Sequence, residues 1–306
     1  MTPLRLGTRG SPLAIIQTQE LRDRLMEAHP DLRAPGALEI VPIATAGDKV
    51  QDRALAEVGG KGLFTKEIER WLAEGRIDMA VHSMKDVPTI LSDEFAVPCI
   101  LPRADPRDAL LGAASIAALP KGAVVGSAST RRQAQLLHAR PDLKVVLFRG
   151  NVNTRLRKLS EGQAAATVLA RAGLDRLAMA DVGATLTPEE MLPSAAQGAI
   201  GVEIRADDGR AGAYLAAIDH APSRAEIECE RALLGALDGS CRTPIAALAE
   251  WDGAVLRLRA LVARPDGTAL WRAERRGPRA DAAAMGRDAG AELRGRADAG
   301  IFEGPR

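Results

Sequence analysis

The sequence predicts an α/β protein with two doubly wound lobes and a small α+β domain at its C-terminal end. A strand, a turn with glycine, serine and arginine, and a helix follow one another at 6–12 and again at 125–132. Two lobes of one design, each placing polar groups beyond its strand ends, would produce this repeat. Alternating apolar and polar residues then mark three strands at 245–251, 254–263 and 268–276.

The first lobe is predicted to comprise residues 1–101 and a returning segment, 199–218. Ser11 is a good N-cap and Pro12 fits the first helical position, so a helix is expected to begin there. The glycine-rich stretch at 45–62 is expected to be either a lid or a disordered segment. We expect strands at 3–9, 38–44, 77–81, 95–101 and 199–205, and helices at 12–28 and 63–74.

The pattern restarts after a linker at 102–106 and gives the second lobe, residues 102–198. Small residues at 193–198 are predicted to cross back to the first lobe. The last domain, 219–306, is expected to hold the three alternating strands between two helices. The expected elements are strands at 123–126, 144–148 and 166–170 in the second lobe, and helices at 223–237 and 280–296 in the last domain.

The composition is that of a protein with sizeable hydrophobic cores. Its positive and negative residues nearly balance over the whole chain, so any strongly charged site must come from local clustering. Hydrophobic residues make up 46% of the 306 residues, and no run of 18 apolar residues could span a membrane. The 41 basic and 40 acidic residues give a net charge of +1, which argues against a nucleic-acid surface. Three cysteines and four histidines show no metal-ligand spacing. No apolar signal segment follows Met1, so we expect a cytoplasmic protein. We further expect a monomer that binds neither metal, nucleic acid nor membrane.

Polar residues gather where the buried strand at 77–81 ends. His82, Ser83, Lys85 and Asp86 follow the apolar run directly. Ligands of open α/β sheets bind beyond the carboxyl ends of strands, so this cluster is a candidate site. The competing interpretation is a turn whose Lys85 and Asp86 pair with each other in solvent.

Arginines cluster at three separate strand ends, at Arg9, at 131–132 and at 149–155. Desolvated like charges repel, so these clusters make sense if a ligand with many carboxylates binds there. The planar guanidinium suits this task because it holds a carboxylate through two parallel hydrogen bonds. The alternative is that each arginine pairs with a nearby aspartate or glutamate.

The three cysteines differ in their surroundings. Cys99 lies inside an expected strand and Cys229 on the apolar face of an expected helix, so both are predicted to be core residues. Cys241 follows a helix end and stands beside Arg242. A neighbouring cation favours the thiolate, which is the nucleophilic form. The alternative is a surface thiol without a function.

These features together resemble the porphobilinogen deaminase (hydroxymethylbilane synthase) family. The most specific match is Ala80-Val-His-Ser-Met-Lys-Asp-Val-Pro88. The other matches keep the family's order and spacing at 7–13, 58–64, 105–109, 125–133, 149–152, 193–198 and 239–245.

The resemblance implies two periplasmic-binding-protein-like lobes and a transferase of porphyrin and haem biosynthesis. Members of the family join four porphobilinogen molecules head to tail onto a covalent dipyrromethane primer and release ammonia each time. Hydrolysis then frees the linear tetrapyrrole hydroxymethylbilane. Each pyrrole carries an acetate and a propionate, so the growing chain is a polycarboxylate of the kind that the arginine clusters would bind.

The resemblance also implies roles for single residues. Cys241 is expected to carry the dipyrromethane cofactor, and Asp86 to act as the catalytic acid that stabilises the substrate cation and moves protons. His82 is expected to be structural. Residues expected to bind cofactor carboxylates are Lys85, Ser129, Arg131, Arg132 and Arg155. Residues expected to contact substrate are Arg9, Ser11, Gln17, Arg149 and Arg176, and Lys61 and Phe64 match the family's mobile loop.

Four residues depart from the family's usual pattern, namely Gly10, Ala46, Ala128 and Arg242. None removes the acid, the anchoring cysteine or the paired arginines. Two other classes fit parts of the sequence. A solute-binding protein has the same two lobes but needs neither Cys241 nor Asp86. A pyridoxal-phosphate enzyme could use Lys85 as its Schiff-base residue, and an absorbance scan would reveal the aldimine.

Overall fold

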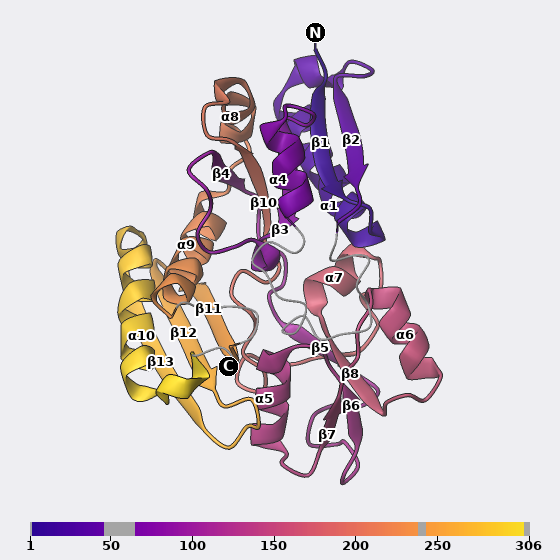
Figure 1. Cartoon of the computed structure of the whole chain (residues 1–306), viewed down its shortest axis with the longest axis vertical. Helices are drawn as coiled ribbons and strands as arrows, with labels where there is room; N and C mark the ends of the chain where they lie inside the picture. Colours follow the sequence, from indigo (N-terminus) through magenta and orange to yellow (C-terminus); the bar gives the residue numbers. More distant parts are fainter. Residues whose placement is uncertain (1, 46–64, 238–242, 303–306) are drawn as a thin grey trace. The chain divides into compact units, whose positions relative to one another are not determined.

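A computed structural model gives the fold shown in Figure 1 and describes residues 2–45, 65–237 and 243–302. The described residues fall into two compact units. Unit 1 lies within Met1–Val50, Gly60–Ala104 and Ala199–Arg224, and unit 2 within Asp105–Gly198 and Ala225–Arg306. The predicted second lobe and the predicted C-terminal domain thus lie in the same unit.

Unit 1 is built on a mixed five-stranded sheet. Its strands are β1 (Leu4–Arg9), β2 (Leu38–Ile43), β3 (Met79–Ser83), β4 (Phe95–Ile100) and β10 (Ile200–Arg205). They are arranged in the order β2-β1-β3-β10-β4, in which β1 runs parallel to β2 and β3 whereas β10 is antiparallel to β3 and β4. The helices of this unit are α1 (Pro12–Ala28), α4 (Lys66–Ala73) and α8 (Gly209–Ala216).

Helix α1 begins where the sequence predicts. The side chain of Ser11 accepts a hydrogen bond from the backbone N–H of Ala14 at 3.3 Å, and Pro12 occupies the first turn. Leu21 and Leu25 are fully buried in the core of unit 1. The apolar face of the helix therefore holds its N-terminus next to the carboxyl end of β1.

Unit 2 contains a second mixed five-stranded sheet. Its strands are β5 (Asp108–Leu111), β6 (Val124–Gly126), β7 (Lys144–Val146), β8 (Ala166–Ala170) and β9 (Ala184–Thr185). Their order is β7-β6-β8-β5-β9, and β6 is parallel to β7 and β8 whereas β5 is antiparallel to β8 and β9. The helices that follow β6, β7 and β8 are α5 (Thr130–Ala139), α6 (Val152–Ser160) and α7 (Arg171–Arg176).

The two five-stranded sheets share one design. Each has three parallel strands and then an antiparallel strand, β10 or β5, which is the first strand after the chain passes from one unit to the other. This shared topology explains the repeated strand, turn and helix pattern of the sequence. The predicted fold class of two α/β lobes is confirmed, with the difference that the antiparallel strands make both sheets mixed.

The C-terminal part of unit 2 is a small α+β domain, as predicted. Strands β11 (Ile245–Asp252), β12 (Val255–Ala263) and β13 (Leu270–Gly277) form an antiparallel sheet in sequence order. Helices α9 (Ala221–Ala236) and α10 (Ala282–Arg296) supply much of the core on one face of this sheet. The turn between β12 and β13 packs on α5, where the Gly267 carbonyl lies 3.0 Å from His138 Nδ1.

None of the helices in the described ranges is both long and apolar enough to cross a membrane.

Candidate active site

Strand β3 ends at a partly exposed acid. It leads into a 3-10 turn, Met84–Asp86, in which Met84 is buried and Asp86 is partly exposed. Within the part of the chain that the structure describes, the Asp86 carboxylate has no hydrogen bond and no ion pair, so it is not paired with Lys85. The solvent-paired turn that the sequence left open is therefore not formed, and the carboxylate is available to a ligand.

Helix α1 is fixed to the end of β3 by a polar contact. Gln17, only 5% exposed, donates from Nε2 to Ser83 Oγ at 2.9 Å, and Ser83 Oγ donates to Gln17 Oε1 at 3.1 Å. Because β1 and β3 are parallel neighbours, their carboxyl ends meet at one edge of the sheet. Unit 1 therefore brings together at this edge the expected residues Arg9, Ser11, Gln17, Lys85 and Asp86.

His82 is buried on β3 and contacts a residue that sequence reasoning missed. Its Nε2 lies 2.9 Å from Oε2 of Glu203, a fully buried carboxylate on β10. The pair joins two strands that are 121 residues apart in sequence. Its location inside the sheet is in keeping with the structural role expected for His82.

In unit 2 the first turn of α5 carries two buried arginines. Ser129 is the N-cap, and its Oγ accepts from the backbone N–H of Arg132 at 3.4 Å. Arg131 and Arg132 are only 5% and 6% exposed. Cations at a helix N-terminus oppose the helix dipole and are costly when buried. A nearby anion is therefore required.

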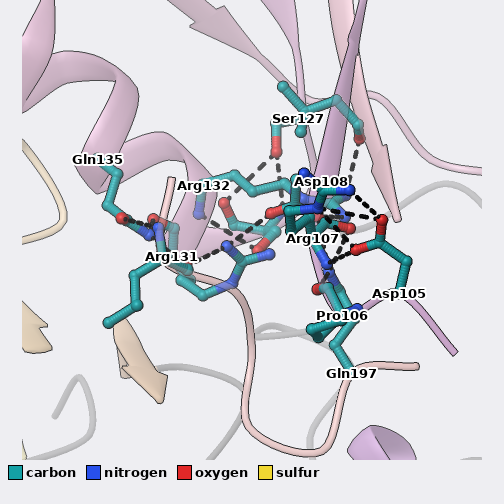
Figure 2. A network of polar contacts seen from close by, with 12 residues as sticks. Asp105, Pro106, Arg107, Asp108, Ser127, Arg131, Arg132, Gln135 and Gln197 are labelled. Carbon is teal, nitrogen blue, oxygen red and sulfur yellow. Dashed lines mark hydrogen bonds and ion pairs between the residues drawn. The ribbon is translucent and has the colours of Figure 1, made fainter. Parts of the chain in front are cut away.

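That anion is Asp108, the fully buried first residue of β5 (Figure 2). Its Oδ1 lies 2.7 Å from Arg132 Nη2 and its Oδ2 2.8 Å from Arg131 Nη1. Burial alone would raise the pKa of Asp108, but the two guanidinium groups outweigh it and hold that pKa well below its usual range. Local pairing, the alternative to ligand binding, thus holds at least in part for Arg131 and Arg132.

Nothing in the sequence singles out Asp108 as the buried partner of these arginines. It lies in the matched stretch 105–109 together with Asp105, and either carboxylate could have been the buried one. Asp105 instead pairs with Arg107, with 2.6 Å between Oδ2 and Nη2, and both side chains are partly exposed. Only the fold shows which of the two acids faces the arginines of α5.

Arg155 carries a charge that no carboxylate of the described residues offsets. On α6, its Nε donates to the Gly150 carbonyl at 2.9 Å, and it has no carboxylate partner among the described residues. Burial lowers the pKa of Arg155 to about 10, and repulsion from Arg132 and Arg149 adds to this effect. A ligand carboxylate would relieve both costs.

The turn before α6 requires glycine. Gly150 has φ of +121°, and a Cβ there would lie 2.6 Å from Thr154 Cβ. Asn151 caps the helix by accepting from the Thr154 backbone N–H at 2.9 Å. This turn sets the buried Arg149 next to the start of the helix that carries Arg155.

Arg176 ends α7 and donates from Nη2 to the Gly198 carbonyl at 3.2 Å. Unit 2 thus holds Ser129, Arg131, Arg132, Arg149, Arg155 and Arg176 of the expected site residues. Three others, Cys241, Lys61 and Phe64, lie outside the described residues, as do the departures Ala46 and Arg242.

Cys99 and Cys229 are core residues, as predicted, and both are fully buried. Burial raises the pKa of each thiol to about 12, helped by Asp219 near Cys99 and by Glu230 next to Cys229. At neutral pH both therefore stay protonated and unreactive.

Two family profiles match nearly the whole chain. The one described as porphobilinogen deaminase, dipyromethane cofactor binding domain, matches residues 4–213, and the one described as porphobilinogen deaminase, C-terminal domain, matches residues 224–295.

Curated relatives carry the same name. Porphobilinogen deaminase of Paracoccus denitrificans is 58% identical over 304 residues, which are 98% of this chain and 96% of that protein. The chloroplastic porphobilinogen deaminases of Oryza sativa subsp. japonica and Pisum sativum are 53% and 54% identical, covering 98% of this chain and 86% and 83% of those proteins. Among solved structures, a putative periplasmic sulfonate-binding protein SsuA of Methylobacillus flagellatus matches with 19% sequence identity and a TM-score of 0.41. The match covers 73% of this chain and 67% of that protein's chain.

Both profiles and the close relatives agree with the motifs, the paired lobes and the arginine-lined strand ends described above. The chain therefore belongs to the porphobilinogen deaminase family, and its residues 4–213 match that family's dipyrromethane cofactor binding domain.

Proposed function

We propose that this protein is a hydroxymethylbilane synthase. It joins four porphobilinogen molecules head to tail on a dipyrromethane primer, releases ammonia at each step, and then releases the linear tetrapyrrole hydroxymethylbilane by hydrolysis. The observation that carries this proposal is the 58% identity to a porphobilinogen deaminase over 98% of this chain and 96% of the relative. The role would be in porphyrin biosynthesis, by a cytoplasmic monomer of three domains.

Asp86 is the proposed catalytic acid. Loss of ammonia from porphobilinogen leaves a cation on the pyrrole, and a carboxylate without an internal partner can stabilise that charge and carry protons. The Gln17–Ser83 contact fixes α1 to the end of the strand from which Asp86 follows. Asp86 therefore lies in the turn directly after a strand end that is fixed in place, which suits a catalytic group.

Cys241 is the proposed anchor of the cofactor. When bound, dipyrromethane supplies the pyrrole carbon to which the first porphobilinogen is joined. The uncompensated charge of Arg155 and the donor-rich surroundings of α5 fit a group that bears several carboxylates.

The other proposed contacts follow the family pattern. Lys85, Ser129, Arg131, Arg132 and Arg155 would hold the carboxylates of the cofactor. Arg9, Ser11, Gln17, Arg149 and Arg176 would contact the substrate, and Lys61 and Phe64 would belong to the loop that gates the site.

Arg155→Met is expected to stabilise the cofactor-free protein while weakening ligand binding. At every pH below about 10 the charged guanidinium is less favourable in the folded protein than in the unfolded chain, and this penalty fades as the pH rises through 10. Allowing for solvent screening, its removal should raise the free energy of unfolding at pH 7 by on the order of 1 kcal/mol. Urea unfolding in a Cys241→Ser background, which is expected to lack the cofactor, measures this change.

The matched control is Arg157→Met on the same helix, where an exposed arginine pairs with Glu161 at 2.7 Å. It should leave stability unchanged or slightly lowered. If Arg155→Met proves no more stable than Arg157→Met, the uncompensated charge at Arg155 is refuted.

The function itself is tested by incubating the purified protein with porphobilinogen. We expect one ammonia released for each porphobilinogen consumed, together with hydroxymethylbilane. Failure of a folded, cofactor-loaded protein to consume porphobilinogen would overturn the proposal.

A further inference from the structure

Asp108 has no part in the chemistry proposed above, yet it contacts both Arg131 and Arg132 (Figure 2). It is fully buried and contacts two guanidinium groups. A buried carboxylate is costly unless its charge and hydrogen bonds are satisfied. Its presence needs a reason beyond the stability of one strand end.

The contacts of Asp108 fix the orientation of both arginines. Arg131 Nη1 donates to the Leu192 carbonyl at 2.7 Å, and Arg132 Nη1 donates to the Val168 carbonyl at 2.7 Å. Arg132 is therefore held at Nη1 by a main-chain carbonyl and at Nη2 by a hydrogen bond to Asp108 Oδ1. Arg131 is held at Nη1 by a main-chain carbonyl and by its ion pair with Asp108, so the rotation of both guanidinium groups is restricted.

The carboxylate is itself held by rigid elements. Gln197 donates from Nε2 to Asp108 Oδ1 at 2.9 Å and to the Pro106 carbonyl at 2.7 Å. The Asp108 carbonyl accepts from the backbone N–H of Leu186 at 2.8 Å. A group fixed on a strand in this way can orient others to the accuracy that a binding site needs.

Asp108 compensates only part of the positive charge. Arg131, Arg132 and Arg155 supply three guanidinium groups, and Asp108 is the one carboxylate that the described residues place in contact with any of them. Arg132 Nε is buried and has no hydrogen-bond partner among those residues. The cluster thus keeps charge and a donor for an outside carboxylate, but in a fixed geometry.

We propose that Asp108 is a positioning residue for ligand carboxylates: it holds Arg131 and Arg132 in the orientation that receives the acetate and propionate groups of the cofactor and of the pyrrole chain that grows on it. This inference rests on the proposed function. Asp108 does not touch the reacting atoms, so its loss should affect cofactor retention and KM for porphobilinogen more than kcat.

The test compares Asp108→Asn with Asp105→Asn in the full-length protein. Asparagine keeps the shape of the side chain and removes the charge. The control loses a carboxylate from the same segment, but one that pairs with Arg107 instead of α5. For Asp108→Asn, at a temperature where circular dichroism shows it folded, we expect a smaller cofactor-loaded fraction by intact mass. In the loaded fraction KM should rise about tenfold or more, with kcat within about threefold of the wild type.

Asp105→Asn should keep the cofactor content and KM of the wild type. A folded Asp108→Asn protein with wild-type cofactor content and KM would show that Asp108 serves only the fold.

Should Asp108→Asn fail to fold, Asp108→Glu is the deciding variant, because it keeps the charge and displaces it by one methylene. A raised KM with little change in kcat is then expected, and a wild-type KM overturns the inference. Wild-type protein that does not turn over porphobilinogen would instead refute the proposed function.

Discussion

Asp86→Asn is expected to lower kcat for porphobilinogen by about 10²–10⁴-fold, the usual contribution of a general acid or base. Asparagine has nearly the same shape but can neither carry the proton nor stabilise a cation through a full charge. The Asp86 carboxylate makes no hydrogen bond or ion pair within the described chain. The free energy of unfolding of the variant should therefore differ from that of the wild type by no more than about 0.5 kcal/mol. Steady-state kinetics and urea unfolding on one preparation measure both quantities.

The matched control is Asp78→Asn, just before the same strand. Asp78 forms two hydrogen bonds with the Arg5 guanidinium, both at 3.1 Å, and accepts a third from the Arg5 backbone N–H at 2.8 Å. The Asp78→Asn variant should have a lower free energy of unfolding than the wild type and an unchanged kcat, which is the reverse of the result expected for Asp86→Asn. An Asp86→Asn enzyme as active as the wild type would remove Asp86 from the mechanism.

Cys241→Ser is expected to give a folded protein without dipyrromethane and without turnover. A serine hydroxyl is a far weaker nucleophile than a thiolate at neutral pH, so the primer should not become attached. The intact mass of the purified variant shows directly whether the adduct is present. Cys229→Ala is the control, because its thiol is buried and protonated. It should keep the adduct, and an adduct that persists in Cys241→Ser would place the anchor elsewhere.

The features that the sequence predicts well are those set by near neighbours. Ser11 and Pro12 define the start of α1 through contacts within one turn. The three strands of the C-terminal sheet pair in sequence order, so period-two patterning was sufficient to predict them. The cluster after β3 was predicted for the same reason, since an apolar run ends there in polar residues.

The features that the sequence does not predict depend on contacts between residues that are far apart in the chain. Strands β5 and β9 have four and two residues, too few for a period to show, and each pairs with strands far away in sequence. The Asp108–Arg132 contact spans 24 residues, and the buried partner of His82 is 121 residues away. A turn rich in arginine indicates that an anion is needed, but only the fold shows that the protein supplies one of the anions itself.

We propose above that this protein builds a tetrapyrrole on a covalently held primer, so primer and added pyrroles should both be found attached to the protein. The intact mass of the wild-type protein, taken before and after brief exposure to limiting porphobilinogen, tests it most directly. We expect a starting mass greater than that of the polypeptide by one dipyrromethane, and then a ladder of one to four added pyrroles. A starting mass equal to that of the bare polypeptide, and unchanged by porphobilinogen, would contradict it.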